Sequence, residues 1–304
     1  MKKSALITGI TGQDGSYLAE FLLKKGYKVH GLVRRVAAED ESHRFWRLRH
    51  LRNKITIHAG SLESYASIIN IITKVKPHEI YHLGAQSYID YAFKDEFSTI
   101  NTNINGTHFL LSAIKEFSPK TKFYFAGSSE MFGKVRQVPQ TEKTPFYPRS
   151  VYGISKVAGF DLTRNYREAY NLFCCSGILF NHESPRRGFE FVTRKITHSV
   201  AKIKFGLQKD LKLGNMEAKR DWGHAKDYVE AMWLMLNQRK PDDYVISTGK
   251  HFSVRDFTKL AFKLVDLDYR KYVKIEKSLY RPSEVESLLG DCRKAKKNLK
   301  WKPK

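Results

Sequence analysis

Cysteine is scarce in this sequence, with only three among 304 residues. Cys174, Cys175 and Cys292 have neither the spacing of a disulfide framework nor that of a metal site, so we expect no metal. The adjacent pair lies inside the apolar run from Leu172 to Phe180. We therefore interpret Cys174 and Cys175 as residues of a buried strand.

Long hydrophobic runs are also absent. No stretch of about 18 apolar residues occurs, which is the length that a membrane-spanning helix needs. The first expected strand begins within four residues of Met1, which leaves no room for a secretory signal peptide. We therefore expect a cytoplasmic protein without a membrane partner. With 304 residues, 41% of them hydrophobic, the chain can bury a large core in one or two domains.

Acidic residues are few, 31 against 54 lysines and arginines, which gives a formal charge of +23. A charge of this size raises the question of a polyanionic partner. Two basic clusters, 34–52 and 294–304, lack the interleaved aromatic residues of a groove for single-stranded nucleic acid. We expect no nucleic-acid partner. A phosphate-rich small ligand or plain surface charge accounts for the excess.

The first half of the chain alternates short β-branched runs with helical patterns. Repetition of strand, helix and strand is typical of an α/β protein with a doubly wound parallel sheet. The expected strands are Ser4–Thr8, Lys28–Val33, Ile55–Ala59, Ile80–Leu83 and Phe123–Ala126, and the first helix covers Ser16–Lys25.

The pattern loosens after Phe180, where Asn181–Gly188 has the composition of a loop that leaves the sheet. Helical patterns follow at Phe191–Phe205 and Asp227–Leu236, and Tyr244–Ser247 is a candidate strand. We expect the chain to pass between a larger and a smaller, discontinuous α/β domain. The larger would comprise 1–180 and about 226–250, and the smaller about 181–225 and 251–304.

Three glycines, Gly9, Gly12 and Gly15, follow the first strand and open the first helix. The spacing Gly-x-x-Gly-x-x-Gly differs from the usual dinucleotide fingerprint, but it allows the same tight turn. A bare backbone and the free N–H groups of a helix N-terminus attract a diphosphate. A purely structural turn is the alternative.

The end of the second strand discriminates between NAD and NADP. An acidic residue there would hold the ribose 2′-hydroxyl, whereas this sequence has Arg34 and Arg35. Two guanidinium groups suit a 2′-phosphate, which favours NADP. Two solvated arginines are the alternative.

Tyr152 and Lys156 lie four residues apart in a helical pattern and therefore share one face. A cation near a phenol favours the phenolate, which can act as a base toward a sugar hydroxyl. A surface pair is the alternative.

The strand that precedes this helix runs into Ser128, Ser129 and Glu130, at the edge where open α/β sheets bind ligands. Glu130 is a candidate general acid or base and Ser128 a partner for a sugar hydroxyl, although both serines suit a turn.

Together, Thr8–Gly15, Ser128-Ser129-Glu130 and Tyr152-x-x-x-Lys156 resemble the extended short-chain dehydrogenases that act on nucleotide sugars. The strings Asn181–Lys195 and Gly214–Tyr228 are similar to hallmarks of the GDP-mannose 4,6-dehydratases, and Arg281-Pro-Ser-Glu-Val285 resembles their late substrate motif. The resemblance covers nearly the whole chain. It implies a Rossmann fold, bound NADP, a GDP-sugar substrate and a homodimer or homotetramer.

The resemblance also implies a hydro-lyase mechanism. Tyr152 would take the proton from the sugar O4 while a hydride leaves C4, and Lys156 would orient the ribose and lower the pKa of the tyrosine. Glu130 would then take the C5 proton and help expel the C6 hydroxyl as water. The hydride returns to C6, so that the cofactor ends as it began. Ser128 would hydrogen-bond near O4.

Matching residue by residue gives three sets of site residues. The catalytic residues would be Ser128, Glu130, Tyr152 and Lys156. The cofactor would contact Gly9, Thr11, Gly12, Gln13, Asp14, Gly15, Arg34, Arg35, Ser61, Leu62, Leu83, Ala85, Ser87, Tyr152, Lys156, His182 and Arg187. The substrate would contact Ser87, Ser128, Glu130, Asn181, Lys195, Gly214, Arg220, Arg281 and Glu284, with Arg220 and Arg281 as diphosphate clamps or, alternatively, in ion pairs with Asp221 or Glu284.

Four departures from the family pattern stand out. Ser128 replaces a common threonine and keeps its hydroxyl, so activity should survive. Ser61 replaces an aspartate that contacts the adenine, which puts that contact in doubt. The segment 36–52 lacks the usual serine-rich pattern of a loop that in the family joins subunits around the cofactor. The chain also ends early, at Lys304. Tetramer assembly and the tail are therefore open.

Alternatives within and outside the enzymes exist. The same reaction on a GDP-manno-heptose or a GDP-N-acetylhexosamine would use identical catalytic residues. An epimerase or reductase is disfavoured because Glu130 supplies an elimination base. A non-catalytic cofactor sensor or an RNA-binding protein would typically lose Tyr152 or Lys156, and both are present.

Overall fold

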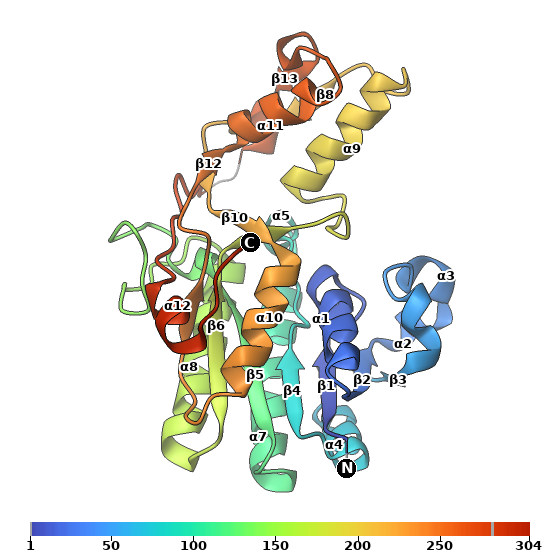
Figure 1. Cartoon of the computed structure of the whole chain (residues 1–304), viewed down its shortest axis with the longest axis vertical. Coiled ribbons are helices and arrows are strands. Elements are labelled where there is room, and N and C mark those ends of the chain that lie inside the picture. The colour runs from blue at the N-terminus through green and yellow to red at the C-terminus, as the bar shows by residue number, and fades with distance from the viewer. Residues whose placement is uncertain (1, 281–282) are drawn as a thin grey trace.

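The structure, a computed structural model that describes residues 2–280 and 283–304, is built around a seven-stranded parallel sheet (Figure 1). The strand order is β11-β6-β5-β4-β1-β2-β3, and neighbouring strands run parallel. The doubly wound parallel sheet expected from the sequence is thereby confirmed. Its strands are β1 (Ser4–Thr8), β2 (Lys28–Val33), β3 (Ile55–Ala59), β4 (Glu79–His82), β5 (Lys122–Ser128), β6 (Cys174–Leu179) and β11 (Tyr244–Ile246).

Helices cover both faces of this sheet and bury two separate apolar cores. On one face α1, α10 and α12 pack together through residues such as Leu18, Met232 and Leu299. On the other face α4, α7 and α8 contribute residues such as Ile72 and Leu111. The bounds are α1 (Gln13–Lys24), α4 (Tyr65–Val75), α7 (Gly106–Phe117), α8 (Val151–Tyr170), α10 (Ala225–Leu236) and α12 (Arg293–Leu299).

Shorter helices connect these layers. The segment after β2 forms α2 (Arg35–Glu39) and α3 (Glu41–Arg44), which lie beside the edge strands in Figure 1. The segment after β4 forms α5 (Ile89–Ala92) and α6 (Glu96–Ile100), and a turn of π-helix, Asn101–Asn105, joins α6 to α7.

A smaller unit stands beyond the carboxyl ends of the main strands, at the top of Figure 1. Its core joins two helices to the parallel pair β8 and β13 through residues such as Ile196, Leu211 and Phe262. Two further short pairs, β7 with β10 and β9 with β12, lie in the segments that lead to it. The elements are β7 (Asn181–Glu183), α9 (Val192–Lys204), β8 (Leu211–Leu213), β9 (Lys219–Arg220), β10 (Trp222–His224), β12 (Phe252–Ser253), α11 (Val254–Lys263) and β13 (Val273–Ile275).

Two details differ from the expectations. Asn181–Glu183 is a strand rather than a loop, because its backbone pairs with β10. The C-terminal helix α12 and Trp301 pack in the core of the main sheet. Their contacts favour counting this segment with the larger domain, whereas the sequence analysis placed it in the smaller. The remaining domain boundaries stay predictions.

The cysteines and the helices bear on two sequence-based expectations. Cys174 and Cys175 are buried in β6, as expected, and burial raises the pKa of both thiols to about 12. All three cysteines are free thiols.

Among the described residues no helix has the length and apolar character needed to cross a bilayer, and no group of three potential metal ligands occurs there.

The order in which the chain adds strands changes direction between β1 and β4. From β1 the chain continues to β2 and β3 on one side, and from β4 it continues to β5 and β6 on the other. Open α/β sheets bind ligands at such a switch point. Gly9 directly follows β1 with a φ of +72°, and a Cβ there would lie 2.8 Å from the backbone nitrogen of Gly84. A Cβ on Gly15 would lie 2.3 Å from the carbonyl oxygen of Gly9. Both positions therefore require glycine so that the turn after β1 can close.

A largely buried ion pair fixes the edge of the sheet that ends in β11. Arg167 of α8 donates to both carboxylate oxygens of Asp243, at 2.9 and 2.7 Å, and to the carbonyl of Cys174. Asp243 also accepts from the backbone nitrogen of Ser176. The pair thus fixes the edge strand β11 and helix α8 to β6.

Replacement of Arg167 by alanine should lower the free energy of unfolding by about 3 kcal/mol, because Asp243 would remain buried without its cation. Urea denaturation measures this loss. Arg164→Ala on the same helix is the control, since its pair with Asp161 is half exposed and such pairs contribute at most about 1 kcal/mol. Equal effects of the two changes would contradict the assignment.

Candidate active site

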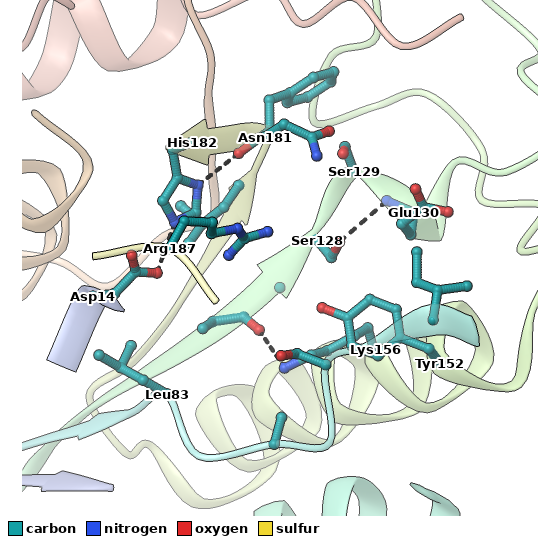
Figure 2. Close-up of a pocket in the computed structure, with 17 residues that line it drawn as sticks. Asp14, Leu83, Ser128, Ser129, Glu130, Tyr152, Lys156, Asn181, His182 and Arg187 are labelled. Atoms are coloured by element: carbon teal, nitrogen blue, oxygen red, sulfur yellow. Dashed lines mark hydrogen bonds and ion pairs between the residues drawn. The ribbon is translucent and has the colours of Figure 1, made fainter. Parts of the chain in front are cut away.

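A pocket lies at the carboxyl ends of β4, β5 and β6, next to the glycine turn (Figure 2). It collects side chains that are far apart in the sequence. The lining residues are Asp14, Leu83, Ala85, Ser87, Ile89, Ala126, Gly127, Ser128, Ser129, Glu130, Tyr152, Lys156, Leu179, Phe180, Asn181, His182 and Arg187.

The end of β5 supplies the first two candidate catalytic groups. Ser128 is the last residue of the strand, and its hydroxyl accepts a hydrogen bond from the backbone nitrogen of Glu130 at 3.2 Å. This contact caps the short helical turn Ser129–Met131, which turns Glu130 toward the pocket. Glu130 is 9% exposed. Its carboxyl group is therefore placed at the pocket wall with little contact to solvent.

Helix α8 supplies the other two groups. Ser150 caps its N-terminus by accepting from the backbone nitrogen of Gly153. A Cβ on Gly153 would lie 2.8 Å from the carbonyl oxygen of Glu130, so glycine lets the helix approach the turn closely. Tyr152 and Lys156 then lie one helical turn apart on the face toward the pocket (Figure 2). The ammonium of Lys156 donates to the carbonyl of Ala126 at 2.8 Å.

Burial shifts the pKa values of this pair. Burial raises the pKa of Tyr152 to about 12, and the Ser128 hydroxyl offsets only part of this rise. Burial also lowers the pKa of Lys156 to about 8. The low polarity around both groups disfavours both charged forms, so the tyrosine pKa is raised overall, and the lowering effect of Lys156 stays a prediction.

A second pair of charges joins the first helix to the segment after β6. His182 donates from Nε2 to Asp14 at 2.6 Å and from Nδ1 to the carbonyl of Phe180 at 2.7 Å. Burial alone would lower the pKa of His182, but the carboxylate of Asp14 raises it overall. Burial alone would raise the pKa of Asp14, but His182 and Arg187 lower it. The pair is therefore an ion pair of imidazolium and carboxylate, stacked on Tyr228.

Arg187 directs its guanidinium into the same pocket (Figure 2). Its Nε lies 3.2 Å from the carboxylate of Glu183, and its guanidinium lies 3.6 Å from the ring centre of Phe191. Asn181, at the start of β7, lines the pocket beside it. The structure thus brings an amide and a cation from the segment after β6 to the groups on β5 and α8.

The remaining predicted cofactor residues lie along the turn and the strands next to the pocket. Around Gly12 a Cβ would meet a single atom within 4 Å, the carbonyl oxygen of Gly9, so the backbone there is open to a ligand. Gln13 is buried, and its amide bonds the carbonyl of His182 and the hydroxyl of Ser184. Gln13 therefore connects the two segments of the site.

The predicted cofactor residues at the ends of β2 and β3 differ in their surroundings. Arg34 is exposed, and it forms no ion pair with any described residue, whereas Arg35 pairs with Glu39 at 3.0 Å. Both arginines are exposed, so the choice between a phosphate site and two solvated arginines stays open. The Ser61 hydroxyl accepts from the backbone nitrogen of Glu63, and Leu62 packs beside Gly106. The lost adenine contact at Ser61 stays a prediction.

The predicted substrate residues of the smaller unit lie outside the pocket wall. Arg220 is buried and lies 3.5 Å from Glu284, which agrees with the pairing named as its alternative. Lys195 is half-buried on α9, and burial lowers its pKa. Gly214 follows β8, where a Cβ would lie 2.5 Å from the carbonyl oxygen of Leu279. Arg281 lies outside the described residues.

Several lining residues were not predicted. Ala126 and Gly127 are among the last residues of strand β5, and Ser129 directly follows the strand. Leu179 and Phe180 stand at the end of β6, so the rule that ligands lie at carboxyl strand ends could have found them. Ile89 of α5 carries no signal of this kind, since its position depends on how the segment after β4 folds over the pocket.

Comparison with known proteins agrees with this geometry. The sequence model of the family described as GDP-mannose 4,6 dehydratase matches residues 6–304. The GDP-mannose 4,6 dehydratase of Homo sapiens is 49% identical over 99% of this chain and 87% of its own length. The GDP-mannose 4,6-dehydratase of Yersinia enterocolitica is 44% identical over 99% of this chain and 90% of its own.

Solved structures with the same fold are more distant in sequence. A dTDP-glucose 4,6-dehydratase from Streptomyces venezuelae, crystallised with NAD, has a TM-score of 0.87 at 21% identity and covers 99% of this chain and 92% of its own. The UDP-glucose 4-epimerase of Thermotoga maritima has a TM-score of 0.86 at 24% identity, covering 99% and 94%. These structures establish the fold, and the family model together with the closely similar sequences shows that the chain belongs to the GDP-mannose 4,6-dehydratase family.

Proposed function

We propose that this protein catalyses the NADP-dependent 4,6-dehydration of GDP-mannose to GDP-4-keto-6-deoxy-mannose. The observation that carries the proposal is the convergence of Ser128, Glu130, Tyr152 and Lys156 on one pocket in a chain of this family. The relatives at nearly half identity are named for GDP-mannose, which favours mannose over a heptose or an N-acetylhexosamine.

The residues around the glycine turn fit a nicotinamide dinucleotide. The open backbone at Gly12 and the N-terminus of α1 suit its diphosphate, and Leu83, Ala85 and Ser87 lie between the turn and the pocket. When bound, this group would accept a hydride from C4 of the sugar and return it to C6, while C5 regains a proton in place of the one lost in the elimination. Arg34, the exposed arginine after β2, suits the 2′-phosphate of NADP.

Tyr152 acts as the base toward the hydroxyl at C4. Together with Lys156 it holds two titratable protons at neutral pH, and Lys156 loses its proton first because its pKa is the lower of the two. Transfer of the phenol proton to the neutral amine then produces a phenolate beside an ammonium, the less populated arrangement of the same one-proton state. That state can take the O4 proton while C4 is oxidised to a ketone. The Ser128 hydroxyl lowers the pKa of the tyrosine and is placed to hydrogen-bond the same oxygen.

Glu130 acts on the next carbon. A ketone at C4 acidifies the proton on C5, and the Glu130 carboxylate takes that proton. The same carboxyl group then protonates the departing C6 hydroxyl, which leaves as water. Because the proton taken from C5 is available for the leaving group, one acid–base residue serves both halves of the elimination.

The smaller unit would hold the GDP moiety. Lys195 of α9 and Arg220 of β9 bring positive charge beyond the pocket mouth, and Asn181 offers an amide between them and the sugar. The buried position of Arg220 beside Glu284 fixes its side chain before a ligand arrives. We assign these residues to the diphosphate and the nucleoside on the basis of charge and position.

We also propose a cytoplasmic homo-oligomer without a nucleic-acid partner. Phe97, Ile100 and Ile154 are 88%, 40% and 50% exposed, and they lie on α6 and α8, which pack against one another. Clustered apolar side chains of this size commonly mark contacts between subunits.

Incubation with GDP-mannose and NADP should yield a product lighter by one water without net formation of reduced cofactor, as mass spectrometry and absorbance can show. Tyr152→Phe should lower kcat by at least about 100-fold, because general-base catalysis contributes factors of this order. Glu130→Gln should stall after oxidation at C4 and accumulate reduced cofactor. An unchanged rate in Tyr152→Phe would contradict the mechanism.

The rate should also depend on pH through the Tyr152 and Lys156 pair. The pair loses its first proton near pH 8, since burial lowers the pKa of Lys156 to about 8 and raises that of Tyr152 to about 12. The reactive state has one proton, so kcat should rise with pH up to about 8 and then level off. Measurement between pH 6 and 10 at saturating substrate tests this, and a flat profile below pH 8 would oppose it.

Arg34→Ala should weaken NADP binding by about 10- to 100-fold, as expected for loss of a charge-assisted hydrogen bond to a phosphate. Binding of NAD, which lacks that phosphate, should change little. Arg35→Ala is the matched control, because its guanidinium already pairs with Glu39. Titration of protein fluorescence with both cofactors measures the effect. Equal losses for NADP and NAD in Arg34→Ala would remove the basis for NADP.

A further inference from the structure

The segment 45–51, here called the strap, crosses from the edge of the sheet to the glycine turn. Phe45, Leu48 and Leu51 are buried in the core shared with α1. His50 donates to Glu20 of α1 at 2.6 Å. The strap is therefore anchored along α1 by apolar burial and by a polar contact. None of the family strings named above lies within it.

Arg47 extends from the strap to two other segments of the site. Its Nε donates to the carbonyl of Arg186 at 2.7 Å, and its Nη1 donates to the carbonyl of Thr11 at 3.3 Å. The guanidinium also lies 4.3 Å from the ring centre of Trp46. One side chain thus connects the strap, the glycine turn and the segment after β7.

Among the residues that the structure describes, the charges around Arg47 are not balanced. Arg186 hydrogen-bonds Glu20, and Arg187 lies beside Glu183, so each of these cations has a carboxylate partner. Arg47 has none at ion-pair distance among the residues that the structure describes. Burial lowers the pKa of Arg47. Three neighbouring arginines lower it further, whereas Glu190 raises it. A half-buried cation among other cations would be stabilised by a further anion.

The donors of Arg47 that remain free suit such an anion. A guanidinium has five N–H groups, and the two carbonyls engage one on Nε and one on Nη1. The others belong to a guanidinium whose Nη1 contacts Thr11, in the turn whose open backbone at Gly12 fits a diphosphate. Because both carbonyl contacts hold the fork in place, little side-chain entropy would be lost when it binds a phosphate.

We propose that Arg47 is a cofactor-binding residue that closes the glycine turn over the diphosphate of the bound dinucleotide and slows its release. This inference rests on the proposed function, in which the cofactor is regenerated in every cycle and gains from staying bound. The assignment of Arg47 comes from the three segments it connects and from its unbalanced charge.

The test compares Arg47→Met and Arg47→Lys with Arg44→Ala. Arg47→Met keeps the length of the side chain and removes its charge. Arg44→Ala removes a cation from the same region, one that is 58% exposed and lies 3.8 Å from Asp40. NADP binding is measured by fluorescence titration, release by stopped flow, and thermal stability without cofactor by calorimetry.

Arg47→Met should weaken NADP binding by about 10- to 100-fold, mainly through faster release, and reduce the dependence of binding on salt. Arg47→Lys should recover part of the affinity, and Arg44→Ala should stay within about twofold of the unchanged protein. The melting temperature without cofactor should fall by no more than a few degrees in Arg47→Met, as expected for the loss of two hydrogen bonds to carbonyl groups.

Three results would overturn the proposal. Unchanged NADP affinity in Arg47→Met would show that the residue does not contact the cofactor. A rise in KM for GDP-mannose with normal NADP binding would move Arg47 to the substrate. A large fall in melting temperature without cofactor would make its role structural. Failure of the unchanged protein to bind NADP would instead refute the proposed function, so the two failures are distinguishable.

Discussion

The packing of the first turn of α8 against the carboxyl end of β5 is the contact on which the site depends. Gly153 lets the helix approach the carbonyl of Glu130, and Lys156 donates to the carbonyl of Ala126 two residues before Ser128. These backbone contacts place four reactive side chains at one wall. They also bury the Tyr152 and Lys156 pair, which explains why the tyrosine pKa rises although a lysine lies one turn away.

A second set of contacts joins the glycine turn to the segment that leads toward the smaller unit. The Asp14 and His182 ion pair, the amide of Gln13 and the guanidinium of Arg47 all cross between these two parts of the chain. The cofactor turn and the pocket are thereby held as one body. A ligand that spans both would meet groups that are already in place, which reduces the ordering needed on binding.

The large positive charge is now partly accounted for. Several arginines near the glycine turn have carboxylate partners, whereas Arg34 and Arg47 have none at ion-pair distance among the described residues. Both lie near the proposed path of a dinucleotide with phosphate groups. Under the two proposals, these arginines would use part of the charge to hold a small anion.

Much of the fold could be predicted from the sequence, because local patterns encode it. Alternating β-branched runs and helical spacing indicated the parallel sheet, and the glycines after β1 indicated the turn, since only glycine tolerates the backbone at Gly9. The spacing of Tyr152 and Lys156 placed both on one helical face. The family motifs then indicated the residues that the pocket collects from β5, β6 and α8.

Other features depended on contacts between distant segments. The short strand at Asn181 exists because β10 pairs with it, and α12 joins the main core because Trp301 and Leu299 find apolar partners there. The pKa values of Tyr152 and Lys156 follow from burial, which no local spacing reveals. The sequence by itself determined the elements and the residue types of the site. The tertiary structure alone decided the pKa shifts of Tyr152 and Lys156 and the contacts of Arg47, because both depend on which charges and carbonyls come to lie within a few ångströms.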